Sequence, residues 1–142
     1  EIGKAEIVRE KGDIGLVAAG DRLITALEVA DLLEEKNISV RVINARFIKP
    51  LDEQLIKESA ANLSALFTIE NSSIIGGLGS AVAELIAEGH FPNLLFRRFG
   101  LPDEFITHGS TETLLKEIHL DTESLTDRIT TLLQQVNNKS FS

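Results

Sequence analysis

The chain has 142 residues, of which 43% are hydrophobic, and it carries a formal net charge of −8. This length and composition predict one folded domain rather than a disordered segment, and the dispersed negative charge argues against binding to nucleic acid or to anionic membrane surfaces. Because there is no cysteine, a disulfide framework, a thiol nucleophile and a thiolate metal site are excluded. No apolar run approaches the roughly 20 residues of a membrane span, so we expect a cytoplasmic location.

The chain begins with two predicted strands and a helix. Charged residues flank the apolar positions of residues 4–9, which indicates an edge strand. Residues 14–19 (IGLVAA) are almost wholly apolar, which is typical of a strand buried on both faces. Asp21 is placed to cap a helix over residues 22–36. The apolar stripe predicted for this helix consists of Leu23, Leu27, Ala30 and Leu33.

A third strand and a second helix follow. Residues 40–44 (VRVIN) predict the strand, and Asp52 is placed to cap a short helix that ends at residue 61. Arg46 and Lys49 lie between these elements. They could bind an acidic partner, although such a pair more often holds a loop by bonding carbonyls or carboxylates.

The next segment predicts a buried strand, a glycine-rich loop and a helix. Residues 65–69 form the strand, and the polar residues 70–73 are expected to end it. Ser80 is placed to cap a helix over residues 80–88, and Gly89 is expected to end that helix. The loop between strand and helix contains Gly76, Gly77 and Gly79.

Two interpretations of these glycines stay open. A helix N-terminus behind a glycine-rich loop suits an anion, but the glycines could simply let the helix pack closely on the sheet. Residues 77–82 loosely match a dinucleotide-binding fingerprint, yet the acidic residue expected about twenty positions later is absent. No phosphate-loop lysine follows the glycines, so a P-loop is excluded.

One more strand and two helices complete the prediction. Residues 94–99 (LLFRRF) contain two arginines, which indicate a strand at an edge or with an open face, and residues 100–103 are expected to end it. A helix is expected to end near residue 119, and Asp121 or Thr122 is placed to cap the last one. The apolar stripe of the last helix consists of Leu125, Ile129, Leu132, Leu133 and Val136.

Strands that alternate with helices predict a three-layer α/β/α sandwich around a mostly parallel sheet. In such folds, ligands favour the crevice at the carboxyl ends of the strands, where the strand order reverses. The residues expected to line this crevice are Gly20, Asp21, Glu70, Asn71, Gly76, Gly77, Gly79 and Ser80. The three histidines lack the spacing of metal ligands.

Three segments carry a family resemblance: residues 41–52 (RVINARFIKPLD), 70–82 (ENSSIIGGLGSAV) and 100–110 (GLPDEFITHGS). Together they resemble the C-terminal domain of the transketolase family of thiamine-diphosphate enzymes. The third segment, with residues 114–123, resembles the 1-deoxy-D-xylulose-5-phosphate synthases within that family. The first two are also similar to the β-subunits of 2-oxo-acid dehydrogenases.

The resemblance implies a mixed five-stranded sheet in the order 1-3-2-4-5, with the first strand antiparallel beside the third. The short turn at Gly12, taken alone, would instead favour a hairpin between the first two strands. The resemblance also implies that residues 1–142 are the third domain of a longer enzyme, and the polar residues 137–142 are expected to fray.

The family chemistry joins a two-carbon unit from pyruvate to glyceraldehyde 3-phosphate with release of carbon dioxide, a step toward isoprenoids and thiamine. Thiamine diphosphate and magnesium carry it, and the family binds both in its first two domains. We therefore expect no catalytic, cofactor-binding or metal-binding residue in this chain, and no activity of the isolated domain.

The implied partners are the N-terminal and middle domains and a second subunit, since this domain is expected to support a homodimer. The alternatives are a docking domain, as in the dehydrogenase β-subunits, and a regulatory site for a small anion or nucleotide at the glycine-rich loop. The residues expected to make interdomain contacts or to hold loops are Arg46, Lys49, Asp103 and His108.

Overall fold

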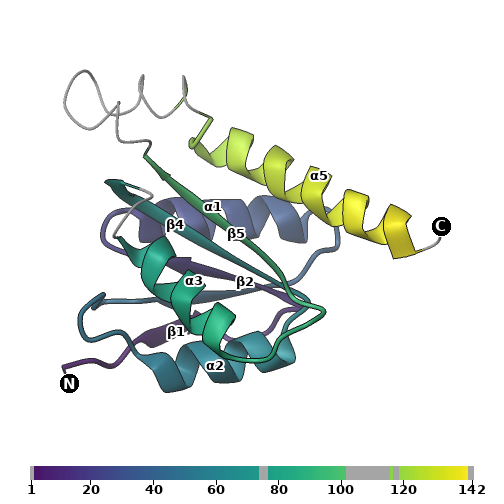
Figure 1. Ribbon diagram of the computed structural model, residues 1–142. Helices are drawn as coiled ribbons and strands as arrows, with labels where there is room; N and C mark the ends of the chain where they lie inside the picture. The colour runs from purple at the N-terminus through teal and green to yellow at the C-terminus, as the bar shows by residue number, and fades with distance from the viewer. Residues whose placement is uncertain (1, 74–76, 102–115, 117–118, 141–142) are drawn as a thin grey trace.

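The computed structural model describes residues 2–73, 77–101, 116 and 119–140 (Figure 1). Its strands are β1 (Glu6–Arg9), β2 (Ile14–Ala18), β3 (Val40–Asn44), β4 (Ala65–Ser73) and β5 (Leu95–Leu101). Its helices are α1 (Arg22–Glu34), α2 (Glu53–Asn62), α3 (Leu78–Glu88) and α5 (Thr122–Ser140). The strands form one sheet in the order β1-β3-β2-β4-β5, in which β1 alone is antiparallel to its neighbour. The predicted fold is confirmed, and the hairpin alternative is wrong.

A close approach at Gly12 explains why β1 and β2 flank β3 instead of pairing. A Cβ added at Gly12 would lie 2.3 Å from the backbone nitrogen of Arg41, at the start of β3. The chain therefore crosses over the first residues of β3, and only glycine leaves room for the crossing. On the far side, the N–H of Asp13 donates to the carbonyl of Ser39 at 3.1 Å.

Two ion pairs join the edge strand β1 to helix α1. Nη1 of Arg9 lies 2.6 Å from Oδ1 of Asp31 on α1, and Nη2 pairs with Oε2 of Glu34 on the same helix. These carboxylates raise the pKa of Arg9, the hydrogen bond to Asp31 being the largest cause. A charged residue on an edge strand, as predicted from residues 4–9, thus also anchors that strand.

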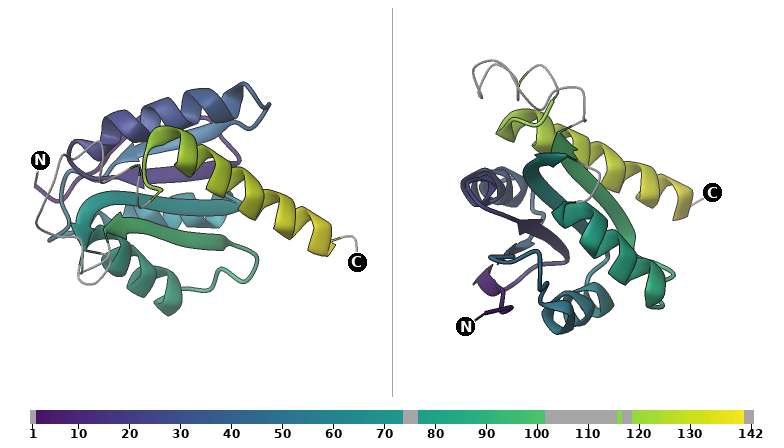
Figure 2. Two further views of the ribbon diagram at one scale, coloured as in Figure 1. Left: turned by 90° about the horizontal axis from the view of Figure 1, so that it is seen from above. Right: turned by 60° about the vertical axis from the view of Figure 1, so that its left-hand side comes forward.

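Two hydrophobic cores lie on opposite faces of the sheet. Figure 2 shows α1 and α5 over one face and α2 and α3 over the other. The first core includes Leu16, Phe67, Phe99, Leu125 and Ile129. The second core includes Val17, Ile43, Ile56, Leu66 and Leu78. Because side chains alternate along β2, this fully buried strand serves both cores, as its apolar run predicts.

The buried face of α1 differs from the predicted stripe. Ala30 and Leu33 are buried as expected, but Leu23 and Leu27 are only partly buried. The buried positions are Arg22, Thr25, Ala26, Val29, Ala30 and Leu33. The physical reason is that α1 contacts α5 as well as the sheet, so residues on more than one side of the helix are covered.

Two predicted strand ends are wrong. Strand β4 does not stop at residue 70 but runs to Ser73, which pairs with Leu101 after a shift in register. For the same reason β5 continues through Gly100 to Leu101. Helix α5 runs to Ser140, and the fraying expected of residues 137–142 stays a prediction. The helix expected to end near residue 119 falls mostly outside the described residues. No helix within the described ranges is long and apolar enough to cross a membrane.

The side chain of Asp52 bonds the start of α2 and the segment ahead of β1, so replacing it tests what these two bonds contribute to stability. Its Oδ1 accepts the N–H of Leu55 at 3.2 Å, which confirms the predicted cap, and its Oδ2 accepts the N–H of Ala5 at 2.9 Å. We expect Asp52→Ala to lower the free energy of unfolding by about 1–2 kcal/mol, because both N–H groups lose their acceptor.

Urea denaturation measures this loss. The exposed neighbour Glu53 supplies the matched control, since Glu53→Ala removes a carboxylate that is not the cap. A variant Asp52→Ala as stable as the wild type would show that the cap contributes nothing.

Candidate functional site

The loop after β2 meets the last residues of β4 at the carboxyl end of the sheet. Ala18 is in register with Ile69, so the next residues of each strand are neighbours. Across the boundary, Nδ2 of Asn71 donates to Oδ1 of Asp21 at 2.5 Å. Gly20 lies in the left-handed region with φ of 63° and faces open space. The structure therefore brings Gly20, Asp21 and Asn71 together, where the reversal of strand order was expected to place them.

Asp21 does not cap α1, which corrects the prediction from sequence. It occupies the position before the helix but has a helical backbone (φ −70°, ψ −11°) and makes no side-chain capping bond. A capping residue normally has extended backbone angles, which let its side chain reach back to the first turn. Here the carboxylate turns instead to the amide of Asn71.

Glu70 fills the position at which an anion was expected. It is only 2% exposed, its Oε1 accepts the N–H of Leu78 at 2.7 Å, and its Oε2 accepts the N–H of Gly79 at 2.5 Å. These are the first two residues of α3, so the carboxylate bonds two N–H groups that have no partner within the helix. The anion at this helix N-terminus is a side chain from the neighbouring strand.

The predicted cap at Ser80 is therefore wrong. Helix α3 begins two residues earlier, at Leu78. The residue at the cap position is Gly77, which has no side chain to form a capping bond. The same bonds explain why β4 runs past Ile69, since Glu70 can be buried in a strand once both of its oxygens have donors.

Burial raises the pKa of Glu70. The N–H groups of Gly79 and Leu78 and the positive charge of Arg98 oppose this shift by stabilising the charged form. The carboxylate thus lies in a low-dielectric position with donors on both oxygens, which is the environment of a structural anchor.

Gly79 serves the packing of α3 on β5. A Cβ at this position would lie 3.0–3.1 Å from three atoms of the Arg98 side chain. Any larger residue would push the helix or the arginine stem away, so the packing interpretation of the glycines is supported at this position. Gly76 lies outside the described residues.

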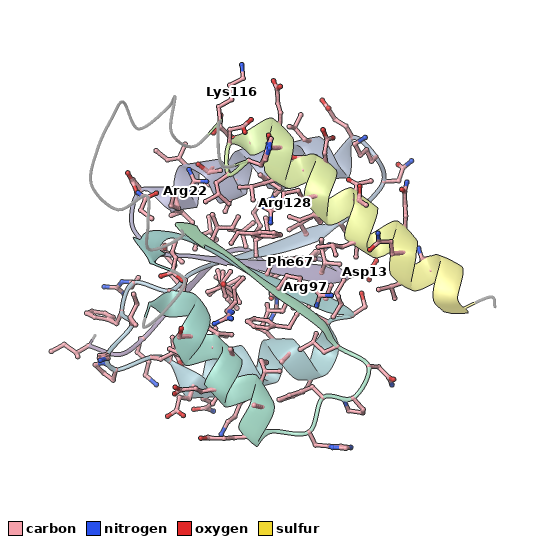
Figure 3. All side chains as sticks on the ribbon, turned by 45° about the horizontal axis from the view of Figure 1, so that its top comes forward. Asp13, Arg22, Phe67, Arg97, Lys116 and Arg128 are labelled. Carbon is pink, nitrogen blue, oxygen red and sulfur yellow. The ribbon has the colours of Figure 1, made fainter. Side chains whose placement is uncertain are left out.

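The sequence did not predict a role for Arg22, which the structure buries. It is 4% exposed, and its Nη2 donates to the carbonyl of Leu120, ahead of α5. Figure 3 shows Arg22 where the start of α1 meets the segment that leads into α5. Burial lowers the pKa of Arg22, while nearby carboxylates, first that of Asp21, oppose the shift. One arginine in a first helical turn has no periodic signal, so its role could not be predicted.

Of the four residues expected to make interdomain contacts or to hold loops, the structure describes Arg46 and Lys49, in the segment between β3 and α2. The backbone N–H of Arg46, at φ of 60°, donates to Oδ1 of Asn44 at 3.2 Å, and its guanidinium lies 5.4 Å from the Phe47 ring centroid. Lys49 is exposed in the same loop, ahead of α2. Asp103 and His108 lie outside the described residues.

These groups do not fit thiamine diphosphate or its metal. Any diphosphate at the start of α3 would meet the Glu70 carboxylate, which already holds the N–H groups that an anion needs. Among the described residues, no three carboxylate or histidine side chains converge on a position for a metal ion. No catalytic step can therefore be derived from this crevice.

Comparison with known proteins agrees with this geometry. The profile of the family described as "Transketolase, C-terminal domain" matches residues 3–125. The chain belongs to this family. As a transketolase C-terminal domain, it has the sheet order and the antiparallel first strand that the resemblance implied.

Its relatives are longer proteins. It is 39% identical over 139 residues to the 1-deoxy-D-xylulose-5-phosphate synthase of Geobacillus sp. (strain WCH70), covering 98% of this chain and 22% of the relative. For the synthase of Bacillus mycoides (strain KBAB4), identity is 40% over 132 residues, covering 93% and 21%. The chain thus spans about a fifth of the length of these curated relatives.

Two solved structures share the fold. One is titled "Split gene transketolase, inactive beta4 tetramer"; it is 35% identical with a TM-score of 0.82, covering 94% of this chain and 43% of that one. The transketolase of Campylobacter jejuni has 15% identity and a TM-score of 0.60, covering 91% and 18%. At this low identity the second match shows the fold alone.

The raised pKa of Glu70 predicts a pH dependence of stability. The folded chain holds this proton more tightly than the unfolded chain does, so the contribution of Glu70 is complete below the ordinary value of 4.5 and is lost as pH rises through the raised pKa. We expect the wild type to lose stability relative to Glu70→Gln over that range. Glu70→Ala, which removes both acceptors, should be less stable by about 1–3 kcal/mol.

Denaturant titrations from pH 4.5 upward measure both effects. The variant Glu58→Gln removes a carboxylate from an exposed position on α2 and serves as the control. If the curves of the wild type and Glu70→Gln run parallel, Glu70 does not titrate differently in the folded state.

Proposed function

We propose that this chain is the C-terminal domain of a 1-deoxy-D-xylulose-5-phosphate synthase, and that it supports the assembly of that enzyme without taking part in its chemistry. The observation that carries the proposal is the identity of 39% to such a synthase along nearly the whole chain. The crevice supports the noncatalytic role, because its polar groups bond one another: Asp21 to Asn71, and Glu70 to the start of α3.

In this proposal the reaction joins pyruvate to glyceraldehyde 3-phosphate with loss of carbon dioxide. Thiamine diphosphate and magnesium are bound by the N-terminal and middle domains, in the cytoplasm, and the enzyme is a homodimer. This domain contributes a rigid scaffold, since both faces of its sheet are closed by helices and two separate cores (Figure 2). A scaffold of this kind can hold neighbouring domains in place without contacting the substrate.

A second candidate is a separately encoded chain of a transketolase. It is favoured by the similarity to a structure titled as a split-gene transketolase, of which this chain covers 43%. The reaction class would stay a transketolase-type transfer, but the catalytic domains would be on other polypeptides.

A docking domain, as in 2-oxo-acid dehydrogenase β-subunits, would capture a peripheral subunit-binding domain in a pull-down.

A chimera tests the first proposal. In the Geobacillus synthase, the matched C-terminal region is replaced by residues 1–142 of this chain. We expect the chimera to dimerise and to keep most of the parent activity, because the replaced region has a structural role. The same enzyme truncated before this region should lose its activity.

The matched control carries the corresponding domain of a 2-oxo-acid dehydrogenase β-subunit, and we expect that chimera to be inactive. A dimeric, folded chimera with this chain but with no more activity than the truncated enzyme would count against the proposal.

Cofactor and anion titrations test whether the crevice is a ligand site. We expect no heat on titrating the 142-residue chain with thiamine diphosphate and magnesium, because Glu70 already bonds the start of α3. Phosphate and nucleotides should leave the amide resonances of Gly77, Gly79 and Ser80 unmoved. Micromolar binding of the cofactor, or saturable amide shifts with phosphate, would contradict this expectation.

A further inference from the structure

The outer edge of β5 carries backbone groups that no described strand covers. Strand β5 ends the sheet order and pairs with β4 on one side. The N–H of Leu95 donates to the carbonyl of Ser64 at 3.1 Å, so the peptide groups of Leu95 face inward. Since these groups alternate along a strand, those of Phe96 and Arg98 face away from the sheet.

Two arginines lie beside this edge. Nη1 of Arg97 donates to the outward carbonyl of Phe96 at 2.8 Å. The guanidinium of Arg128, on α5, lies 4.6 Å from the centroid of the Phe99 ring, and its Nη1 donates to the carbonyl of His119 at 3.1 Å. Figure 3 labels both arginines, one on β5 and the other on α5.

No acidic side chain neutralises these two cations among the described residues. Both of the ion pairs seen there belong to Arg9, at the opposite edge of the sheet. Arg97 and Arg128 instead bond carbonyl oxygens, which carry no full charge. Burial lowers the pKa of Arg128, and no carboxylate is among the causes that would oppose this shift.

A pocket of about 410 Å³ lies between β5 and α5, and its lining includes Arg97, Arg98 and Arg128. Thr131 and Gln135 of α5 line it too, so uncharged hydrogen-bonding groups lie beside the arginines. Asp127 also lines the pocket, but it forms no ion pair with Arg97 or Arg128. A carboxylate that enters this pocket could accept hydrogen bonds from two guanidinium groups, the strongest kind of side-chain recognition.

We propose that the outer edge of β5 binds an extended acidic peptide segment of a partner protein, which adds to the sheet as a further strand and places a carboxylate between Arg97 and Arg128. In this mode, backbone hydrogen bonds to Phe96 and Arg98 supply affinity, and the pocket supplies selectivity for acid. Arg97 would release the carbonyl of Phe96 to the incoming strand.

Charge identifies the occupant. A second copy paired through the same edge, about an axis at the arginines, would place Arg97 and Arg98 against their own counterparts, and like charges opposite each other destabilise such a pair. Edge protection alone explains charges on β5, but it does not explain Arg128, which lies on α5 and points its guanidinium over Phe99.

The test uses the 142-residue chain and a fluorescent peptide of about nine residues that alternates glutamate with valine. A peptide with glutamine in place of glutamate is its control. We expect saturable binding of the glutamate peptide, with shifts of the Phe96 and Arg98 amide resonances. Arg97→Glu should weaken binding about tenfold or more. Lys57→Glu makes the same charge change at an exposed position on α2 and should leave binding unchanged.

Four outcomes would overturn the proposal. Equal binding of the two peptides, or unchanged binding by Arg97→Glu, would remove the role of charge. Inorganic phosphate that binds at the arginines when the peptide does not would indicate a site for small anions. Self-association that Arg97→Glu abolishes would show that the occupant is a second copy. Circular dichroism of each variant verifies that the fold is intact.

Discussion

The hydrogen bonds from the start of α3 to the carboxylate of Glu70 fix the structure at the carboxyl end of the sheet. They join the end of a central strand to the beginning of a helix across eight and nine positions of sequence. A buried carboxylate without donors is strongly unfavourable, so the burial of Glu70 requires α3 to begin where it does. In turn, the N-terminus of α3 finds the negative charge that it favours.

The same bonds decide what the crevice can do. In many α/β proteins, a helix N-terminus at this position holds a phosphate. Here the position contains a side chain of the protein, and the adjacent loop is closed by the bond between Asp21 and Asn71. At this end of the sheet, the polar groups of Asp21, Asn71 and Glu70 thus bond other groups of the chain.

The arginines on the two edge strands of the sheet have different partners. At β1, the cation of Arg9 is matched by two carboxylates of α1, so the edge is bound to the body of the domain. At β5, the cation of Arg97 bonds a carbonyl of its own strand. Both strands end the sheet, and an uncovered strand edge is a template for another strand. What distinguishes β5 is that, among the described residues, its cation has no carboxylate partner, which is why an acidic segment suits β5.

Local and apolar features were determined by the sequence alone. The buried strand β2 follows from an uninterrupted apolar run, and the cap at Asp52 follows from a bond to a residue three positions on. The strand order and the antiparallel β1 came from the family resemblance, because the turn at Gly12 by itself favoured a hairpin.

Tertiary structure decided the features in which a distant partner competes with a local one. Asp21 bonds Asn71, which is 50 positions away, in place of the first turn of α1. Arg22 is buried because Leu120, 98 positions on, supplies an acceptor. Such partners become neighbours only when the sheet has assembled, so a pattern of nearby residues carries no sign of them.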